Sequence, residues 1–117
     1  MGEAYCPKRG DLVWLTFTPY AGHEQAGQRP ALILSPESYN QKVGLALACP
    51  VTTQVKGYPF EVSIPHGLDV SGVVLADQVK SLDWKARKAR FGCTVPHATL
   101  SEVLSKLAPL LMESTRL

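Results

Sequence analysis

The segment that leads into the apolar run at residues 31–34 brings an acid and a guanidinium close together. It carries Glu24 and Arg29, with His23 beside the acid. Pro30 fixes its own backbone and biases Arg29 towards an extended conformation, so the arginine side chain projects from a firm base. Such groups can move protons and stabilise negative charge. A glutamate–arginine pair in a loop is more often structural, however, so this segment indicates chemistry only in combination with others.

A second polar segment, at residues 52–59, follows another apolar run. Its first side chains are hydrogen-bond donors with no acid among them: Thr52, Thr53, Gln54 and Lys56. Donors without a nearby acid suit a phosphate group. The same residues also suit a turn that hydroxyl groups stabilise, and both interpretations stay open.

A third polar segment carries Asp77, Gln78 and Lys80 and ends the apolar run at residues 73–79. These side chains could bind a ligand, but Asp77 could as readily cap or brace the fold.

Basic residues gather between positions 80 and 90. One acid, Asp83, stands among five cations: Lys80, Lys85, Arg87, Lys88 and Arg90. The formal net charge of the chain is only +2, which by itself does not indicate a polyanion partner. The cluster can hold phosphates, although a charge run is more often a solvated face.

The 117 residues are expected to form one domain, residues 1–117, because two domains would each be far below the usual size. Hydrophobic residues make up 45% and charged residues 19%, which excludes a disordered or fibrous chain. The longest apolar stretches are too short to span a bilayer, and the first residues lack the pattern of a signal peptide. We therefore expect a cytoplasmic protein with no membrane association.

The three cysteines, Cys6, Cys49 and Cys93, show no spacing typical of a zinc site. The histidines at positions 23, 66 and 97 are isolated from one another. We expect reduced, partly buried thiols, no metal and no cofactor.

Six short apolar runs, separated by Gly, Pro, Asn and Ser, predict a small antiparallel barrel or sandwich. They lie at residues 12–17, 31–34, 45–51, 60–64, 73–79 and 91–95. Strict alternation predicts that Phe60, Val62 and Ile64 face the core. The runs at 31–34 and 45–49 are continuously apolar, which predicts strands covered on both faces by an extra layer.

The C-terminal segment predicts an amphipathic helix that supplies this layer. Thr99 and Glu102 have the spacing of a capping box at its start. Pro109 is expected to bend or divide the helix. One stripe, which we expect to be core or subunit interface, contains Leu100, Val103, Leu104, Leu107 and Leu111.

Several motifs in order along the chain resemble those of the MazF/PemK family of toxin–antitoxin endoribonucleases, from about Tyr5 to Leu111. They are Gly10-Asp11, Glu24-Gln25-Ala26-Gly27 with Arg29-Pro30, Thr52-Thr53-Gln54, Lys56-Gly57-Tyr58-Pro59-Phe60-Glu61-Val62 and Leu75-Ala76-Asp77-Gln78-Val79-Lys80-Ser81. The resemblance implies a mainly β fold with helices (α+β), an SH3-like small β-barrel with a C-terminal amphipathic helix. It also implies a homodimer and an intracellular toxin that an antitoxin neutralises.

The resemblance further implies cleavage of single-stranded RNA without a metal, giving a 2′,3′-cyclic phosphate and a 5′-hydroxyl. Arg29 matches the family's catalytic arginine and would stabilise charge on the phosphorane. Thr52 would donate to non-bridging oxygens, and Glu24 would act as general base or orient Arg29. His23 departs from the family pattern, and we expect it to face solvent rather than to join proton transfer.

The remaining matched positions would hold the RNA backbone or bases: Thr53, Gln54, Lys56, Tyr58, Asp77, Gln78 and Lys80. A small protein reads splayed single-stranded bases rather than the deep groove of duplex RNA. Tyr58, Phe17 and Trp84 could stack on such bases, although Phe17 and Trp84 could equally be core. The family implies a short cleavage motif, often containing ACA.

Family antitoxins end in an acidic disordered tail that covers the RNA site. Lys56 and the cations between Lys80 and Arg90 are the expected docking points for such a tail.

Two other functions fit the same fold. A CcdB-like gyrase poison depends on a tryptophan near its C-terminus, whereas the tryptophans here are Trp14 and Trp84. A purely structural RNA-binding barrel would not need Glu24, Arg29 and Thr52 together.

Overall fold

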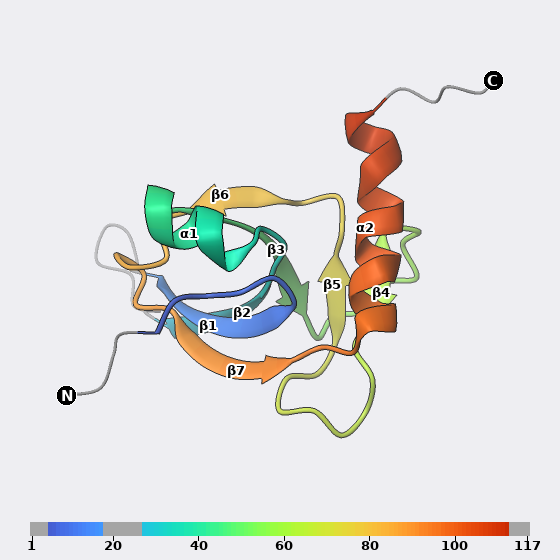
Figure 1. The fold of residues 1–117 in the computed structure, drawn as a ribbon. Helices are drawn as coiled ribbons and strands as arrows, with labels where there is room; N and C mark the ends of the chain where they lie inside the picture. Colours follow the sequence, from blue (N-terminus) through green and yellow to red (C-terminus); the bar gives the residue numbers. More distant parts are fainter. Residues whose placement is uncertain (1–4, 18–26, 113–117) are drawn as a thin grey trace, which may run out of the picture.

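The computed structural model describes residues 5–17 and 27–112 (Figure 1). Within these residues the strands are β1 (Asp11–Phe17), β2 (Gly27–Ile33), β3 (Ala46–Thr52), β4 (Glu61–Ser63), β5 (Val73–Leu75), β6 (Lys80–Leu82) and β7 (Arg90–Thr94). The helices are α1 (Glu37–Val43) and α2 (His97–Leu111). Neither helix has the length and apolar character that a membrane crossing requires.

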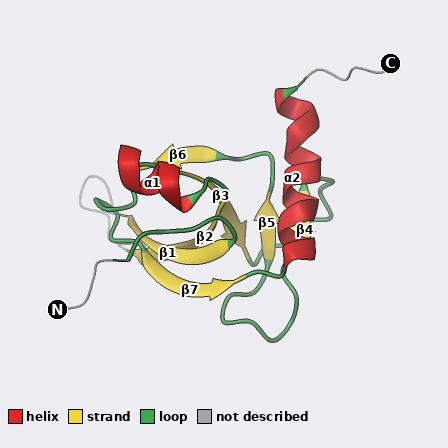
Figure 2. Ribbon diagram, viewed as in Figure 1, coloured by secondary structure: helices red, strands yellow, loops and turns green. Residues whose placement is uncertain are grey.

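The strands form one strongly curved antiparallel sheet with the order β4-β5-β3-β2-β1-β7, and β6 pairs with β3 beside this path. Figure 2 shows the sheet wrapping round on itself, with α2 lying against β4. The longest pairing joins β1 to β2, from Leu12 opposite Leu32 to Phe17 opposite Gly27. The predicted mainly β, small barrel-like fold with a C-terminal helix is confirmed.

The central strands are covered on both faces, as predicted from their continuous apolar runs. Along β2, Leu32 belongs to one buried cluster, whereas its neighbours Ala31 and Ile33 belong to a second. This division follows from the strand period of two, which points successive side chains to opposite faces. The alternation in the 60–64 run is confirmed as well, because Val62 and Ile64 are buried and Phe60 packs against the first cluster.

The C-terminal helix covers only one of these faces. Val103 and Leu107 of α2 join the first cluster. The second cluster includes the buried indole of Trp84, and Tyr5 and Cys6 of the N-terminal segment pack against this cluster. The prediction that the C-terminal helix supplies the whole covering layer is therefore wrong for the second face.

The predicted run at 73–79 divides into β5 and a turn that leads to β6. The N–H of Gln78 donates to the carbonyl of Leu75 (3.1 Å), which closes the turn and leaves Asp77 at its corner. The pair Asp77-Gln78 interrupts the apolar residues at this corner, but the prediction of one run from 73 to 79 left β6 out.

Helix α1 was also not predicted, because its residues lie between the apolar runs at 31–34 and 45–51, in one of the connections that separate the predicted strands. Its C-cap, Gly44, has a φ of 83° that favours glycine. Its interior holds the buried Asn40, whose amide donates to the carbonyls of Pro7 (2.8 Å) and Ser35 (3.0 Å). Tertiary contacts of this kind stabilise a short helix that its own sequence supports weakly.

The predicted capping box at the start of α2 is wrong. The helix begins at His97 after Pro96, whose carbonyl accepts the N–H groups of Thr99 (3.0 Å) and Leu100 (3.2 Å). Thr99 is therefore already inside the helix and is buried. Pro109 does not divide the helix, which continues to Leu111.

Asp11, from the Gly10-Asp11 motif, ties three segments together. Its buried carboxylate accepts hydrogen bonds from the hydroxyl of Tyr5 (2.5 Å), the N–H of Lys8 (3.1 Å) and the hydroxyl of Thr94 (3.3 Å). Burial and this carboxylate raise the pKa of Tyr5 well above its ordinary value. The motif thus fastens the N-terminal segment to β1 and β7.

Candidate active site

A pocket of about 570 Å³, which we call the arginine pocket, lies at the ends of β2 and β3. It contains four of the predicted site residues, Arg29, Thr52, Thr53 and Gln54. Its other lining residues are Trp14, Gln28, Pro30, Val51, Asp69, Val70 and Ser71. The pocket therefore combines a guanidinium with hydroxyl and amide donors, a set that suits an anionic group.

The register of β2 against β3 explains why Arg29 and Thr52 meet, although they lie far apart in the sequence. Ala31 is the partner of Pro50 in this antiparallel pair. Two residues further along each strand, the same register brings Arg29 level with Thr52. Arg29 is exposed on β2, and Thr52 is half-buried as the last residue of β3.

The backbone at Thr52 is fixed from two sides. Its hydroxyl oxygen accepts the N–H of Gln54 (3.1 Å), which turns the chain into the loop. Gly72, with a φ of 117°, lies directly against it, and a Cβ there would overlap the Thr52 carbonyl oxygen and lie 2.9 Å from its carbon. The position of Thr52 therefore requires a residue without a side chain, glycine, at position 72.

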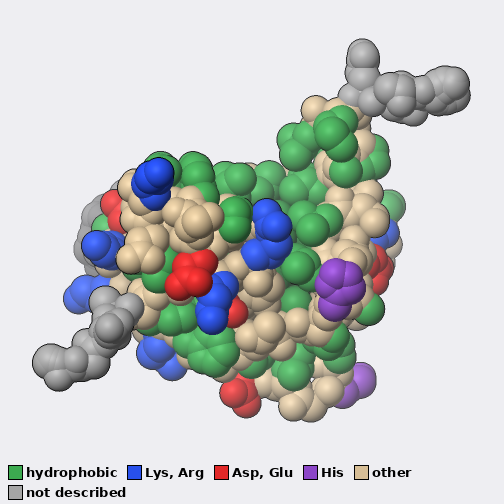
Figure 3. All heavy atoms as spheres, in the orientation of Figure 1, with side chains coloured by type: hydrophobic (Ala, Val, Ile, Leu, Met, Phe, Trp, Pro, Cys, Tyr) green, Lys and Arg blue, Asp and Glu red, His purple; other side chains and the backbone are tan. Residues whose placement is uncertain are grey.

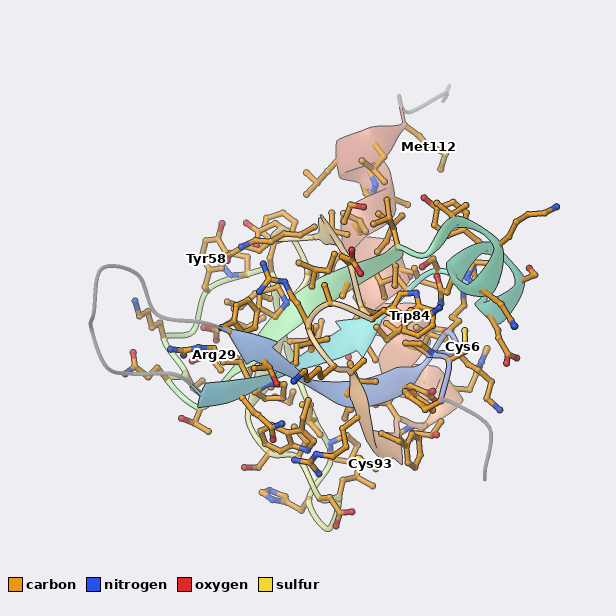
Figure 4. All side chains as sticks on the ribbon, turned by 90° about the vertical axis from the view of Figure 1, so that its left-hand side faces the viewer. Cys6, Arg29, Tyr58, Trp84, Cys93 and Met112 are labelled. Atoms are coloured by element: carbon orange, nitrogen blue, oxygen red, sulfur yellow. The ribbon has the colours of Figure 1, made fainter. Side chains whose placement is uncertain are left out.

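A second pocket of about 440 Å³, which we call the tyrosine pocket, adjoins the first and shares Thr52 and Gln54 with it. Its remaining lining residues are Lys56, Tyr58, Glu61, Leu75 and Gln78. Three of these, Lys56, Tyr58 and Gln78, were predicted as substrate-binding residues. Figure 4 shows Arg29 and Tyr58 on the same side of the molecule, as two adjoining pockets require.

The loop that carries Lys56 and Tyr58 is held by two side chains outside it. The Glu61 carboxylate accepts the N–H groups of Lys56 and Gly57, both at 3.0 Å. The ammonium of Lys106, on α2, donates to the carbonyl of Pro59 (2.8 Å). The backbone of the loop is thus anchored at its middle and at its end.

Asp77 does not line either pocket. Its Oδ2 accepts the hydroxyl hydrogen bond of Tyr58 (2.6 Å). This hydrogen bond is the main reason that the pKa of Tyr58 is raised above its ordinary value.

Lys80 lies on β6, is exposed, and lines neither pocket. Glu24 and His23 fall outside the described residues.

The three residues named as possible stacking surfaces differ in how exposed they are. Trp84 is buried and donates its indole N–H to the carbonyl of Asn40 (3.1 Å), so the hypothesis that it stacks on a base is wrong. Figure 4 places it on the side of the molecule away from Arg29 and Tyr58. Phe17 is half-buried, with the guanidinium of Arg87 4.4 Å from its ring centre. Tyr58, by contrast, is 45% exposed.

Part of the basic cluster reaches the edge of the arginine pocket. The guanidinium of Arg90 donates to the side-chain oxygen of Gln28 (2.6 Å), and Gln28 lines that pocket. Arg87 donates to the carbonyl of Thr16 (3.4 Å). The contact of Arg90 with Gln28 places positive charge beside the arginine pocket.

Sequence reasoning missed two carboxylates at the site. Asp69 lines the arginine pocket from the connection between β4 and β5, and Glu61 holds the loop of the tyrosine pocket. Glu61 lies within a motif already singled out, so its position next to the loop was a usable signal. No sequence signal pointed to Asp69, because the connection at residues 65–72 comes close to Arg29 only when the sheet has folded.

Among the described residues, no group of three or more His, Cys, Asp and Glu side chains is arranged to hold a metal ion.

The fold and the two pockets define a small curved β-barrel protein with an anion-suited cleft at its strand ends. The family of PemK-like, MazF-like toxins of type II toxin–antitoxin systems matches residues 8–111. Because that match covers most of the chain, the chain belongs to this family.

Named relatives agree with this assignment. The Escherichia coli K12 protein named endoribonuclease toxin MazF is 50% identical over 111 residues, which cover 95% of this chain and 99% of the relative. The Escherichia coli endoribonuclease PemK is 36% identical over 108 residues, which cover 89% of this chain and 81% of PemK. The predicted family and enzyme class, an endoribonuclease toxin, are confirmed by these relatives.

Solved structures show the same fold. A MazE–MazF structure from Deinococcus radiodurans has a TM-score of 0.90 and 58% identity, and covers 94% of this chain and 99% of that chain. A mycobacterial endoribonuclease in complex with its cognate antitoxin has a TM-score of 0.75 and 25% identity, and covers 94% of this chain and 99% of that chain.

Proposed function

We propose that this chain cleaves single-stranded messenger RNA at a short base motif, one that contains ACA, and that it does so without a metal. The observation that carries this proposal is the arginine pocket, in which the Arg29 guanidinium and the Thr52 hydroxyl come together from adjacent strands. A guanidinium and hydroxyl donors stabilise the additional negative charge that develops on a phosphodiester during its cleavage.

In the proposed reaction, the ribose 2′-hydroxyl loses its proton to a carboxylate, for which Glu24 is the candidate. The 2′-oxygen then attacks phosphorus and forms the 2′,3′-cyclic phosphate. The bond from phosphorus to the 5′-oxygen breaks, and that oxygen takes up a proton to become the 5′-hydroxyl. Arg29 stabilises the charge on the equatorial oxygens, and Thr52 donates to one of them.

The RNA is proposed to extend from the arginine pocket into the tyrosine pocket. Gln54 lines both pockets, and the second supplies an exposed aromatic ring, an ammonium and an amide from Tyr58, Lys56 and Gln78. Bases of a single strand stack on such rings and pair with such amides. Thr53 and Lys80 would hold the backbone.

The proposed partners are a cognate antitoxin and a second copy of the chain. An acidic disordered antitoxin segment would dock on Lys56 and the basic cluster, where Arg90 already lies beside the arginine pocket. Enzyme and antitoxin would act in the cytoplasm, with residues 1–117 working as one domain.

The first test is cleavage of a long single-stranded RNA by the purified protein in EDTA. Arg29→Ala is expected to abolish cutting, because the pocket then lacks its cation. Arg9→Ala is the matched control, since Arg9 donates to the carbonyl of Leu34 and lines neither pocket, and it should cut like the unchanged protein. Fragment ends should carry cyclic phosphate, and a 2′-deoxy sugar at the cleavage site should prevent cutting.

Intact RNA with a folded, antitoxin-free sample would contradict the enzyme proposal. It would favour the alternative, a CcdB-like protein that binds gyrase and cuts nothing.

A further inference from the structure

The ring of Tyr58 forms one wall of the tyrosine pocket and is supported from behind. The ring centres of Tyr58 and Phe60 are 5.8 Å apart and tilted by 49°. Phe60 packs in turn against the first buried cluster. Tyr58 itself stays 45% exposed, so it presents an open aromatic surface on a rigid support.

The hydroxyl of Tyr58 is held by a carboxylate that faces inward. Asp77 Oδ2 accepts the phenolic hydrogen bond at 2.6 Å. Asp77 Oδ1 is buried and accepts no hydrogen bond from any residue in the described ranges. On its inner side Asp77 adds to the raised pKa of the buried Cys49 thiol. Oδ1 is thus shielded from a nucleic acid, Oδ2 is already engaged by Tyr58, and the negative charge of the carboxylate would repel a phosphate.

The backbone around Tyr58 does not depend on Asp77. Glu61 holds the N–H groups of Lys56 and Gly57, and Lys106 holds the carbonyl of Pro59. Asp77 therefore fixes the hydroxyl of the Tyr58 side chain, whereas Glu61 and Lys106 fix the backbone of the loop.

We propose that Asp77 is a positioning residue, which aims the Tyr58 ring so that a base of the bound RNA stacks on it, rather than a residue that contacts RNA. The proposal rests on the proposed function. It replaces the expectation that Asp77 binds substrate directly.

The test is a double-mutant cycle on KM and kcat for a single-site RNA. Tyr58→Phe keeps the ring but removes its anchor, and Asp77→Ala removes the acceptor. Each is expected to raise KM about three- to tenfold with little change in kcat, the size of effect that one charge-assisted hydrogen bond allows. Because both changes break the same contact, the double variant should be no worse than either single variant.

Two further variants sharpen the cycle. Asp77→Asn, whose amide oxygen still accepts a hydrogen bond, should restore part of the lost affinity. Tyr39→Phe removes a hydroxyl from an exposed tyrosine on α1 and should leave KM unchanged. If Asp77→Ala raises KM as much in the Tyr58→Phe background as in the unchanged protein, Asp77 acts on the RNA itself and the proposal is overturned. An unchanged KM for Tyr58→Phe would overturn it as well.

An ultraviolet titration of the tyrosines tests the pairing without RNA. The pKa of Tyr58 should fall towards that of a free phenol in Asp77→Ala, and this change should be absent in the Tyr58→Phe background. If Tyr58 titrates in Asp77→Ala as it does in the unchanged protein, the proposal is overturned, even if RNA is cut. If the unchanged protein cuts no RNA, the proposed function and the stacking role fail together, whereas the titration still reports whether Asp77 holds Tyr58.

Discussion

Cys49 shows how far the fold changes the chemistry of one residue. Its thiol is fully buried on β3 and donates to the carbonyl of Ala76 at 3.7 Å. Burial, together with the nearby Asp77 carboxylate, raises the pKa of Cys49 to about 12. Cys6 and Cys93 are only half-buried. Cys49 is thus a packing residue whose thiol stays protonated at neutral pH.

Alkaline pH is expected to destabilise the folded protein partly through Cys49. The unfolded chain ionises its thiol near the ordinary pKa of 9.0, whereas the folded chain keeps it protonated up to about 12. The free energy of unfolding should therefore be unaffected by this group below pH 9 and should fall as the pH rises from 9 to 12. Urea unfolding at a series of pH values measures this slope.

Cys49→Ala is the control for the alkaline slope. It should reduce the slope without abolishing it, because the pKa of Tyr5 is also raised and contributes with the same sign. An equal slope in Cys49→Ala and the unchanged protein would contradict the assignment.

The loop from Thr53 to Phe60 is the element on which both pockets depend. Its course is set by side chains from two other elements, the Glu61 carboxylate on β4 and the Lys106 ammonium on α2, whereas the Asp77 carboxylate after β5 holds only the phenol of Tyr58. Its starting point, Thr52, is set by the backbone of Gly72. Helix α2 therefore supports the site as well as the core.

Gly72→Ala is expected to disturb the site through the backbone. The added Cβ would overlap the Thr52 carbonyl, and an alanine at a φ of 117° is strained. The free energy of unfolding should fall by about 1–3 kcal/mol, the usual cost of such a conformation. RNA cleavage should fall more than this loss of stability explains, because Thr52 is displaced; both are measured on the same sample.

Gly67→Ala is the matched control, since Gly67 also has a positive φ of 95° but no atom within 4 Å of an added Cβ. It should lose stability and keep its cleavage rate per folded molecule. Equal loss of cleavage in the two variants would show that strain, and not displacement of Thr52, is responsible.

At the scale of the whole molecule, the far end of α2 carries apolar side chains that no other part of the described residues covers. Leu110, Leu111 and Met112 are 52%, 70% and 63% exposed, and Leu104 is 36% exposed. Figure 3 shows hydrophobic side chains gathered over the end of the helix. An apolar patch of this kind marks an interaction surface, and the proposed homodimer would cover it.

Leu111→Lys is expected to weaken the proposed dimer about tenfold or more, because an apolar side chain that the dimer would bury becomes a charge. Sedimentation over a range of concentrations measures the dissociation constant. Glu102→Lys is the control, since it lies about two and a half turns away, on the opposite side of the helix. A dimer unaffected by Leu111→Lys would exclude this end of α2 from the interface.

The sequence by itself determined the class of fold and the residue types of the site. Alternation at 60–64 and continuous apolar runs elsewhere were enough to predict the strands and their covered faces, because side-chain periodicity is a local property. The ordered motifs around Arg29, Thr52 and Tyr58 likewise predicted the family. These signals are read from neighbouring residues and do not require the chain to be folded.

Only the tertiary structure decided which of these residues work together. The pairing of Ala31 with Pro50 brings Arg29 level with Thr52, and the turn after β5 brings Asp77 to the hydroxyl of Tyr58. Trp84 offered the same aromatic character as Tyr58 in the sequence, yet the fold buried one and left the other exposed. Strand register, turn geometry and burial depend on contacts between residues distant in the chain, and local sequence does not encode which distant residue will supply them.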